Sequence, residues 1–193
     1  MERDSLAGTL VFVGAAQFMI FLIIAEAVFK GYSVSQNYIS DLGNYSLSPS
    51  TPHALIFNSS IIVMGLLLIA GGALLWSKDR VSRVLSAFIA LSGIGAAGVG
   101  FFPEGSPYHL HTAFSLIVFL FASLASYPAT FYKRGGSPAW PVLGTLGLVA
   151  LVLFASGISG GLGKGGMERM IAYPNLIWAI GFSASLMTCR SRR

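Results

Sequence analysis

The chain has 193 residues, of which 54% are hydrophobic and only 10% are charged, and its mean hydropathy is +0.74. Soluble domains carry about 25% charged residues, so this composition excludes a water-soluble globular protein and predicts an integral membrane protein with a single domain over residues 1–193. The formal charge of +5 would fit a nucleic-acid partner, but the basic residues lie mostly in short segments between apolar runs. That placement is typical of membrane topology, so we expect the lipid bilayer, and no nucleic acid, as the partner.

Six apolar runs are long enough to cross a hydrocarbon core as helices, which takes roughly 20 residues. They lack the period-two alternation of barrel strands, so the expected fold is all-α, a six-transmembrane-helix bundle. Near its end the first run contains Ala25-Glu26-Ala27, which resembles a signal-peptide cleavage site, but the run is longer than the apolar part of an ordinary signal sequence and is interpreted as a retained helix. The predicted spans are about 8–29, 54–76, 82–102, 109–131, 140–158 and 168–188, with an outer loop at 31–52.

The basic residues divide unequally between the two sides of this bundle. Only Lys30, Lys164 and Arg169 fall on the side of the 31–52 loop. Since cytoplasmic loops carry an excess of lysine and arginine, both termini are predicted to be cytoplasmic, in a multi-pass protein of the cell membrane. The nine residues of the basic side are Arg3, Lys78, Arg80, Arg83, Lys133, Arg134, Arg190, Arg192 and Arg193.

The opposite, non-cytoplasmic side gathers the residues that can carry chemistry. All three histidines and most of the acids fall there, and part of the 31–52 loop is expected to fold over the bundle as a short interfacial helix. A histidine beside carboxylates is typical of general acid–base sites, and an arginine suits the recognition of phosphate or carboxylate. The predicted catalytic residues are Asp41, His109, His111 and Glu168, and the predicted substrate-binding residues are His53, Asn58, Glu104, Arg169 and Tyr173.

The two histidines of 109–131 leave a metal site as one alternative. If the helix already includes both, their i, i+2 spacing puts the rings on largely opposed faces; if the segment is extended, both rings point the same way. A divalent metal such as zinc would then take carboxylate partners as well. The candidate ligands are Asp41, Glu104, His109 and His111, and there is no haem or nucleotide motif.

Several of these residues also have purely structural interpretations. Glu26 and Lys30 are spaced i, i+4 in the order that favours a helix ion pair, and we expect that pair. Asp41 is interpreted as a turn residue or helix cap, and Glu104 as a cap of the fourth helix. Arg169 would equally form a salt bridge with Asp41 or Glu104, while Glu168 and Arg169, as sequence neighbours, should each meet a different element.

The order and spacing of several short motifs are similar to one family. These motifs are Ser40-Asp41-Leu42-Gly43, Phe57-Asn58, Gly100-Phe101-Phe102-Pro103, His109 or His111 followed by Ala113, and Gly166-Met167-Glu168-Arg169 with Trp178 downstream. The chain resembles, over almost its whole length, the prokaryotic six-helix membrane protein family classified as domain of unknown function 998. The resemblance implies a six-helix bundle and no established activity, and it singles out Asp41, Asn58, one histidine of the fourth helix, Glu168 and Arg169.

Two functional hypotheses follow. In the first, an extracytoplasmic polar pocket binds or modifies a lipid-headgroup-like or small polar substrate, with an anionic lipid headgroup as a candidate ligand of Arg169. In the second, the protein is a small transporter or channel, or an accessory subunit of a membrane complex, and the polar cluster is an interhelical lock. The span interiors hold little that is polar beyond Gln17 and Asn58, which favours the first hypothesis over ion-coupled transport. The sequence specifies neither an enzymatic reaction nor an oligomeric state.

Overall fold

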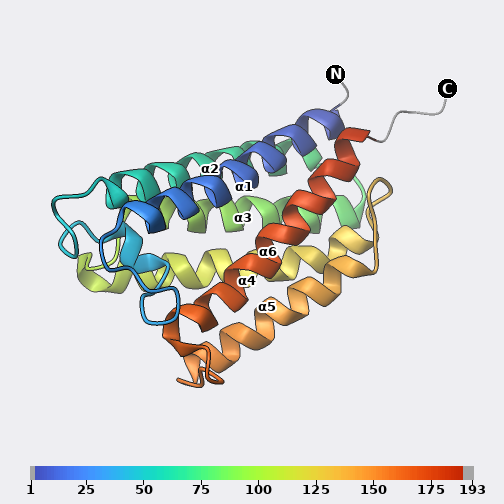
Figure 1. Cartoon of the computed structure of the whole chain (residues 1–193). Helices are drawn as coiled ribbons and strands as arrows, with labels where there is room; N and C mark the ends of the chain where they lie inside the picture. Colours follow the sequence, from blue (N-terminus) through green and yellow to red (C-terminus); the bar gives the residue numbers. More distant parts are fainter. Residues whose placement is uncertain (1–2, 189–193) are drawn as a thin grey trace.

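The computed structural model describes residues 3–188, and it is all-helical over that range (Figure 1). Six α-helices follow one another along the chain, with two short 3₁₀ helices, η1 and η2, in the connections. The elements are α1 (Arg3–Val28), η1 (Ser40–Gly43), α2 (His53–Leu75), α3 (Arg80–Phe101), η2 (Pro107–His109), α4 (Leu110–Thr130), α5 (Ala139–Ala155) and α6 (Gly163–Thr188).

Consecutive helices pack against each other, and α6 returns to contact both α1 and α4. Arg3 and Thr188 therefore lie at one end of the bundle, which we call the terminal end (Figure 1). The connections 29–52, 102–109 and 156–162 lie at the opposite, distal end. The α6 helix runs obliquely across the bundle between the two ends.

Five of the helices, α1 to α4 and α6, are long and apolar enough to cross a membrane, and α5 is a shorter apolar helix of 17 residues. The prediction of a membrane helical bundle is therefore confirmed, and each of the six helices overlaps one predicted apolar run. Lipid-facing surface is evident on α2, where Val63 and Leu66 are 44% and 54% exposed. Such side chains need an apolar solvent.

The α6 helix begins at Gly163, five residues before the predicted span of about 168–188. The glycines of this segment are helical because the 29–52 connection docks on them. The Gly165 N–H donates to Ser35 O at 3.1 Å, and a Cβ on Gly165 would lie only 1.9 Å from Asn37 O. Gly165 therefore permits close backbone contact between α6 and that connection.

The 29–52 connection folds over the distal end of the bundle, as predicted, and includes the 3₁₀ helix η1. Leu42 of η1 is fully buried and Ile39 is 5% exposed. Asn58 of α2 fixes the end of η1, since its Nδ2 donates to Gly43 O at 2.9 Å. These contacts make the connection part of the core and bring its backbone to the start of α6.

Candidate functional site

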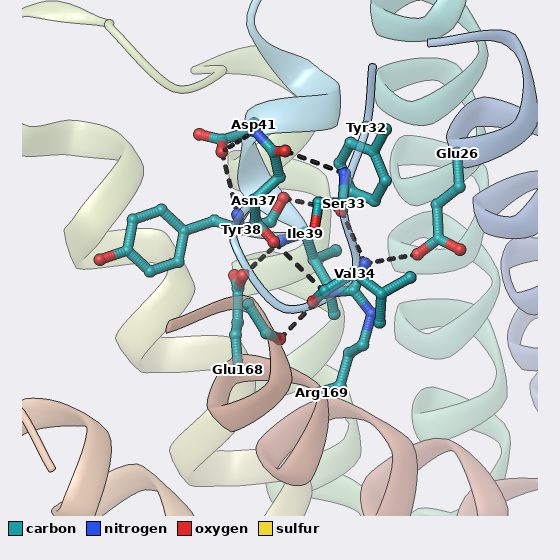
Figure 2. A network of polar contacts seen from close by, with 11 residues as sticks. Glu26, Tyr32, Ser33, Val34, Asn37, Tyr38, Ile39, Asp41, Glu168 and Arg169 are labelled. Carbon is teal, nitrogen blue, oxygen red and sulfur yellow. Dashed lines mark hydrogen bonds and ion pairs between the residues drawn. The ribbon is translucent and has the colours of Figure 1, made fainter. Parts of the chain in front are cut away.

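Arg169 lies in the second turn of α6 and points toward α1 and the 29–52 connection (Figure 2). The residue is only 4% exposed. Its Nη2 donates to Glu26 Oε1 at 2.5 Å and to the Tyr32 hydroxyl at 2.6 Å. The predicted Glu26–Lys30 pair was therefore wrong: α1 ends at Val28, so Lys30 lies outside the helix and the i, i+4 geometry does not exist.

The other terminal nitrogen of Arg169 donates hydrogen bonds to backbone carbonyl oxygens. Nη1 donates to Val34 O at 3.0 Å, Gly165 O at 2.9 Å and Asn37 O at 3.4 Å. All four Nη hydrogens are thus engaged inside the protein, and within residues 3–188 only Nε lacks a partner. We call Arg169, Glu26, Tyr32 and these three carbonyls the Arg169 network. Its salt-bridge partner is Glu26, and not Asp41 or Glu104 as predicted.

Tyr32 links this network to the rest of the connection. Its hydroxyl accepts from Arg169 and donates to Tyr38 O at 2.9 Å. Burial raises the pKa of Tyr32 above its ordinary value, even though Arg169 acts in the opposite direction. The hydroxyl therefore keeps its proton and continues to donate.

Glu168 and Asp41 both bind backbone N–H groups of the same connection (Figure 2). The Glu168 carboxylate, in a residue 6% exposed, accepts from the Ile39 N–H. Asp41 Oδ2 accepts from the Tyr38 N–H at 2.9 Å and from Asn37 Nδ2 at 3.1 Å. Asp41 is thus a turn residue, the structural interpretation that its sequence position favoured.

His109 and His111 lie in different environments. His109 is exposed and has a left-handed backbone with φ 54°, as has Tyr108 with φ 59°. His111 is buried, its Nδ1 donates to Phe102 O at 2.9 Å, and its Nε2 lies 3.2 Å from Glu104 Oε2. Nε2 has no hydrogen-bond partner within the described chain, although it lies against this carboxylate.

The four candidate metal ligands are not brought together. His111 and Glu104 are in contact, Asp41 is bonded within the 29–52 connection, and His109 is exposed on η2. Over residues 3–188, no group of three histidine, cysteine or acidic side chains has an arrangement that would hold a metal ion. The geometry does not fit the predicted zinc set.

The remaining predicted binding residues lie around the same end. His53 is 1% exposed; its Nε2 donates to Asn44 O at 3.1 Å, its Nδ1 is 2.8 Å from the Thr51 hydroxyl, and its ring packs on Phe29. Tyr173 is half-buried one turn beyond Arg169. All polar positions of His53 are used by the protein, so its role in this structure is to fix the connection to α2.

A central cavity runs down the bundle from this cluster. Ser40, His111 and Glu168 line its distal end, and its wall extends along α6 to Phe182. Phe182 follows Glu168 by fourteen positions, which corresponds to about 21 Å of helix. Its volume is about 90 Å³. The lining is otherwise largely apolar, apart from Ser92, Ser115 and Asn175.

Sequence reasoning identified Glu168, Arg169 and the buried His111, but it missed Tyr32, Asn37 and the backbone carbonyls. Asn37 is central, because its Oδ1 accepts from the Ser33 N–H at 3.0 Å while its amide donates to Asp41. The available signal was the high content of tyrosine, serine and asparagine in a connection too long for a simple turn. Such a connection needs internal hydrogen bonds to stay ordered over an apolar bundle.

No curated protein and no solved structure matches the chain. A family model does match, and it covers residues 12–185, which include every helix in whole or in large part and the complete polar cluster. The match agrees with the resemblance carried by the short motifs of the sequence. The chain belongs to the family described as "Protein of unknown function (DUF998)".

Proposed function

We propose that the protein binds a single-chain amphiphile, with the hydrocarbon chain in the central cavity and an uncharged, hydroxyl-bearing head at its distal end. The observation that carries this proposal is the cavity itself, because the residues that line this largely apolar space span about 21 Å of α6 and include, at the distal end, the buried His111, whose Nε2 has no hydrogen-bond partner in the described chain. Ligand sites are mostly apolar, with a few polar groups that fix orientation.

The dimensions favour a hydrocarbon chain over a compact solute. The cavity follows α6 for about two thirds of a hydrocarbon core that is roughly 30 Å thick. Two of the polar side chains on its wall are bonded within the bundle: Ser92 donates to Ile89 O at 2.8 Å, and Asn175 Nδ2 donates to Ser123 Oγ at 2.9 Å. A chain in the cavity would therefore leave no new polar group unpaired along these stretches.

The charges at the distal end favour a neutral head. Glu168 lines the cavity and Glu104 lies against His111, while the positive charge of Arg169 is compensated by Glu26. A phosphate or carboxylate would meet acidic groups there without a free cation. A hydroxyl, by contrast, can donate to His111 Nε2, whose Nδ1 already donates its proton to Phe102 O. We therefore replace the anionic headgroup expected for Arg169 by an alcohol.

The unequal charge distribution supports an orientation with the distal end outside and both termini in the cytoplasm of a multi-pass cell-membrane protein. The ligand head would then lie at the level of the outer leaflet. The alternative function, an interhelical lock in an accessory subunit, is favoured by one observation: the Arg169 network joins α1, α6 and the 29–52 connection. In this proposal the Arg169 network fixes the 29–52 connection over the distal end of the cavity and does not contact the ligand.

The test compares oleyl alcohol with oleic acid, which share a chain and differ in the head. Native mass spectrometry of the purified full chain should show one bound oleyl alcohol per protein. Oleic acid should bind roughly tenfold more weakly at pH 8, because its carboxylate cannot donate the hydrogen bond and is repelled by the acidic side chains. His111→Phe should weaken alcohol binding about tenfold.

Two further variants separate cavity binding from surface adsorption. Ala122→Phe places a ring into the cavity wall and should abolish binding, whereas Val63→Phe, on an exposed face of α2, should not. Equal binding by Ala122→Phe and the wild-type protein would refute occupation of the cavity. Equal binding of alcohol and acid would refute the assignment of the head.

A further inference from the structure

A second cleft lies at the terminal end, remote from the cavity just described. It is formed by the start of α1, the turn between α2 and α3, and the segment that follows α4. Its volume is about 460 Å³. Six of its ten lining residues have ionisable side chains: Arg3, Asp4, Asp79, Lys133, Arg134 and Tyr132.

The two acidic side chains of this cleft, Asp4 and Asp79, accept hydrogen bonds from other groups of the protein. Asp79 accepts from the Ser82 N–H at 2.9 Å and from the hydroxyls of Ser82 and Ser77. These hydrogen bonds hold the pKa of Asp79 well below its usual range, so it remains a carboxylate. Asp4 accepts from the Tyr132 hydroxyl at 3.2 Å and pairs with Arg134 at 3.7 Å.

Two basic side chains of the cleft, Arg3 and Lys133, have weaker contacts with the protein than these acids have. Arg3 and Lys133 are both exposed, and the hydrogen bond recorded for the Arg3 guanidinium is a long one, 3.4 Å to Trp76 O. Arginine and lysine at a membrane surface attract anionic headgroups, and arginine matches the geometry of a phosphate. The electrostatic character of the cleft is therefore that of an anion site.

Aromatic side chains at the rim indicate that the anion belongs to a lipid. Phe131 lines the cleft and is 74% exposed, and Trp76, whose backbone oxygen accepts from the Arg3 guanidinium, is 53% exposed. Exposed aromatic rings at helix ends are typical of the membrane interface, where one side of the ring meets acyl chains. A soluble phosphate compound would gain nothing from these rings.

We infer that the terminal-end cleft binds the phosphate of an anionic phospholipid, held by Arg3 and Lys133, with its chains against Phe131 and Trp76. This site is independent of the amphiphile cavity, since the two share no lining residue. The charge distribution predicts that this end is cytoplasmic, where anionic lipids are concentrated.

The experiment measures lipid binding by isothermal titration calorimetry on the full chain in non-ionic detergent. The probes are dioctanoylphosphatidylglycerol, dioctanoylphosphatidylcholine and inorganic phosphate. Phosphatidylglycerol should bind at least fivefold tighter than phosphatidylcholine. Arg3→Gln and Lys133→Gln should each weaken its binding about fivefold, as expected for one basic residue near an anionic surface.

Lys30→Gln is the matched control, because it removes an exposed lysine at the distal end and should change the affinity less than twofold. Circular dichroism of the variants checks that the fold is retained. Equal affinity for the two lipids, or unchanged affinity in both cleft variants, would overturn the inference. Inorganic phosphate that binds as tightly as phosphatidylglycerol would overturn the lipid assignment.

Discussion

Glu26→Gln should lower the free energy of unfolding by about 3 kcal/mol, since breaking a buried ion pair by removing one charge costs about 3–5 kcal/mol. The lower end of the range applies for two reasons. The Glu26 side chain is 17% exposed, against 5% for Arg169, and the guanidinium keeps the Tyr32 hydroxyl and three carbonyls as acceptors. A loss of this size lowers the folding equilibrium constant more than a hundredfold.

The matched control is Lys30→Gln, which removes the other charge of the i, i+4 pattern. Because Lys30 is exposed beyond the end of α1, this change should stay within about 0.5 kcal/mol of wild type. The measurement is reversible unfolding in mixed non-ionic detergent and dodecyl sulfate micelles, followed by circular dichroism.

A double-mutant cycle isolates the pair. Glu26→Gln combined with Arg169→Met should cost clearly less than the sum of the two single changes, because neither charge is then left buried alone. Additive losses, or a Lys30→Gln loss as large as that of Glu26→Gln, would refute the reasoning.

Two further predictions concern helix packing and alkaline pH. Gly65→Ala should destabilise the bundle by about 2 kcal/mol or more, because the new Cβ would lie 2.5 Å from Ala97 N. The same unfolding assay measures this loss. The control Val63→Ala, on the exposed face of α2, should have little effect. Burial, together with Asp4, raises the pKa of Tyr132 to about 12 from 10.0. The unfolded state therefore loses this proton first, so stability should fall as the pH rises from 10 to 12, and Tyr132→Phe should reduce that fall; identical profiles would contradict the assignment.

The helices could be predicted from sequence because each depends on one local property, an apolar run of sufficient length. The pairing of Glu26 could not. The i, i+4 pattern with Lys30 is local and visible, while the competing partner Arg169 lies 143 residues away and is selected by packing. Because α1 ends at Val28, Lys30 lies outside the helix and Glu26 pairs with Arg169 instead. Helix ends are the least certain feature of a sequence pattern.

The histidine pair shows a second limit. Its spacing allowed either a helix or an extended segment, but the chain adopts neither at His109, which has φ 54°. This left-handed residue separates the exposed His109 from the buried His111. The central cavity was equally invisible, because it depends on side-chain volumes from five helices and follows no motif.

The Arg169 network also constrains the order in which the protein can be assembled. Glu26, in the first helix, finds its compensating charge only in the sixth, so during synthesis the carboxylate enters the nascent bundle without it. The 29–52 connection also cannot reach its final conformation before α6 is present, since its carbonyl oxygens accept from the same guanidinium. Arrival of α6 is therefore the event that closes the bundle, and a chain truncated before Gly163 should keep its helices but leave this end open to proteases.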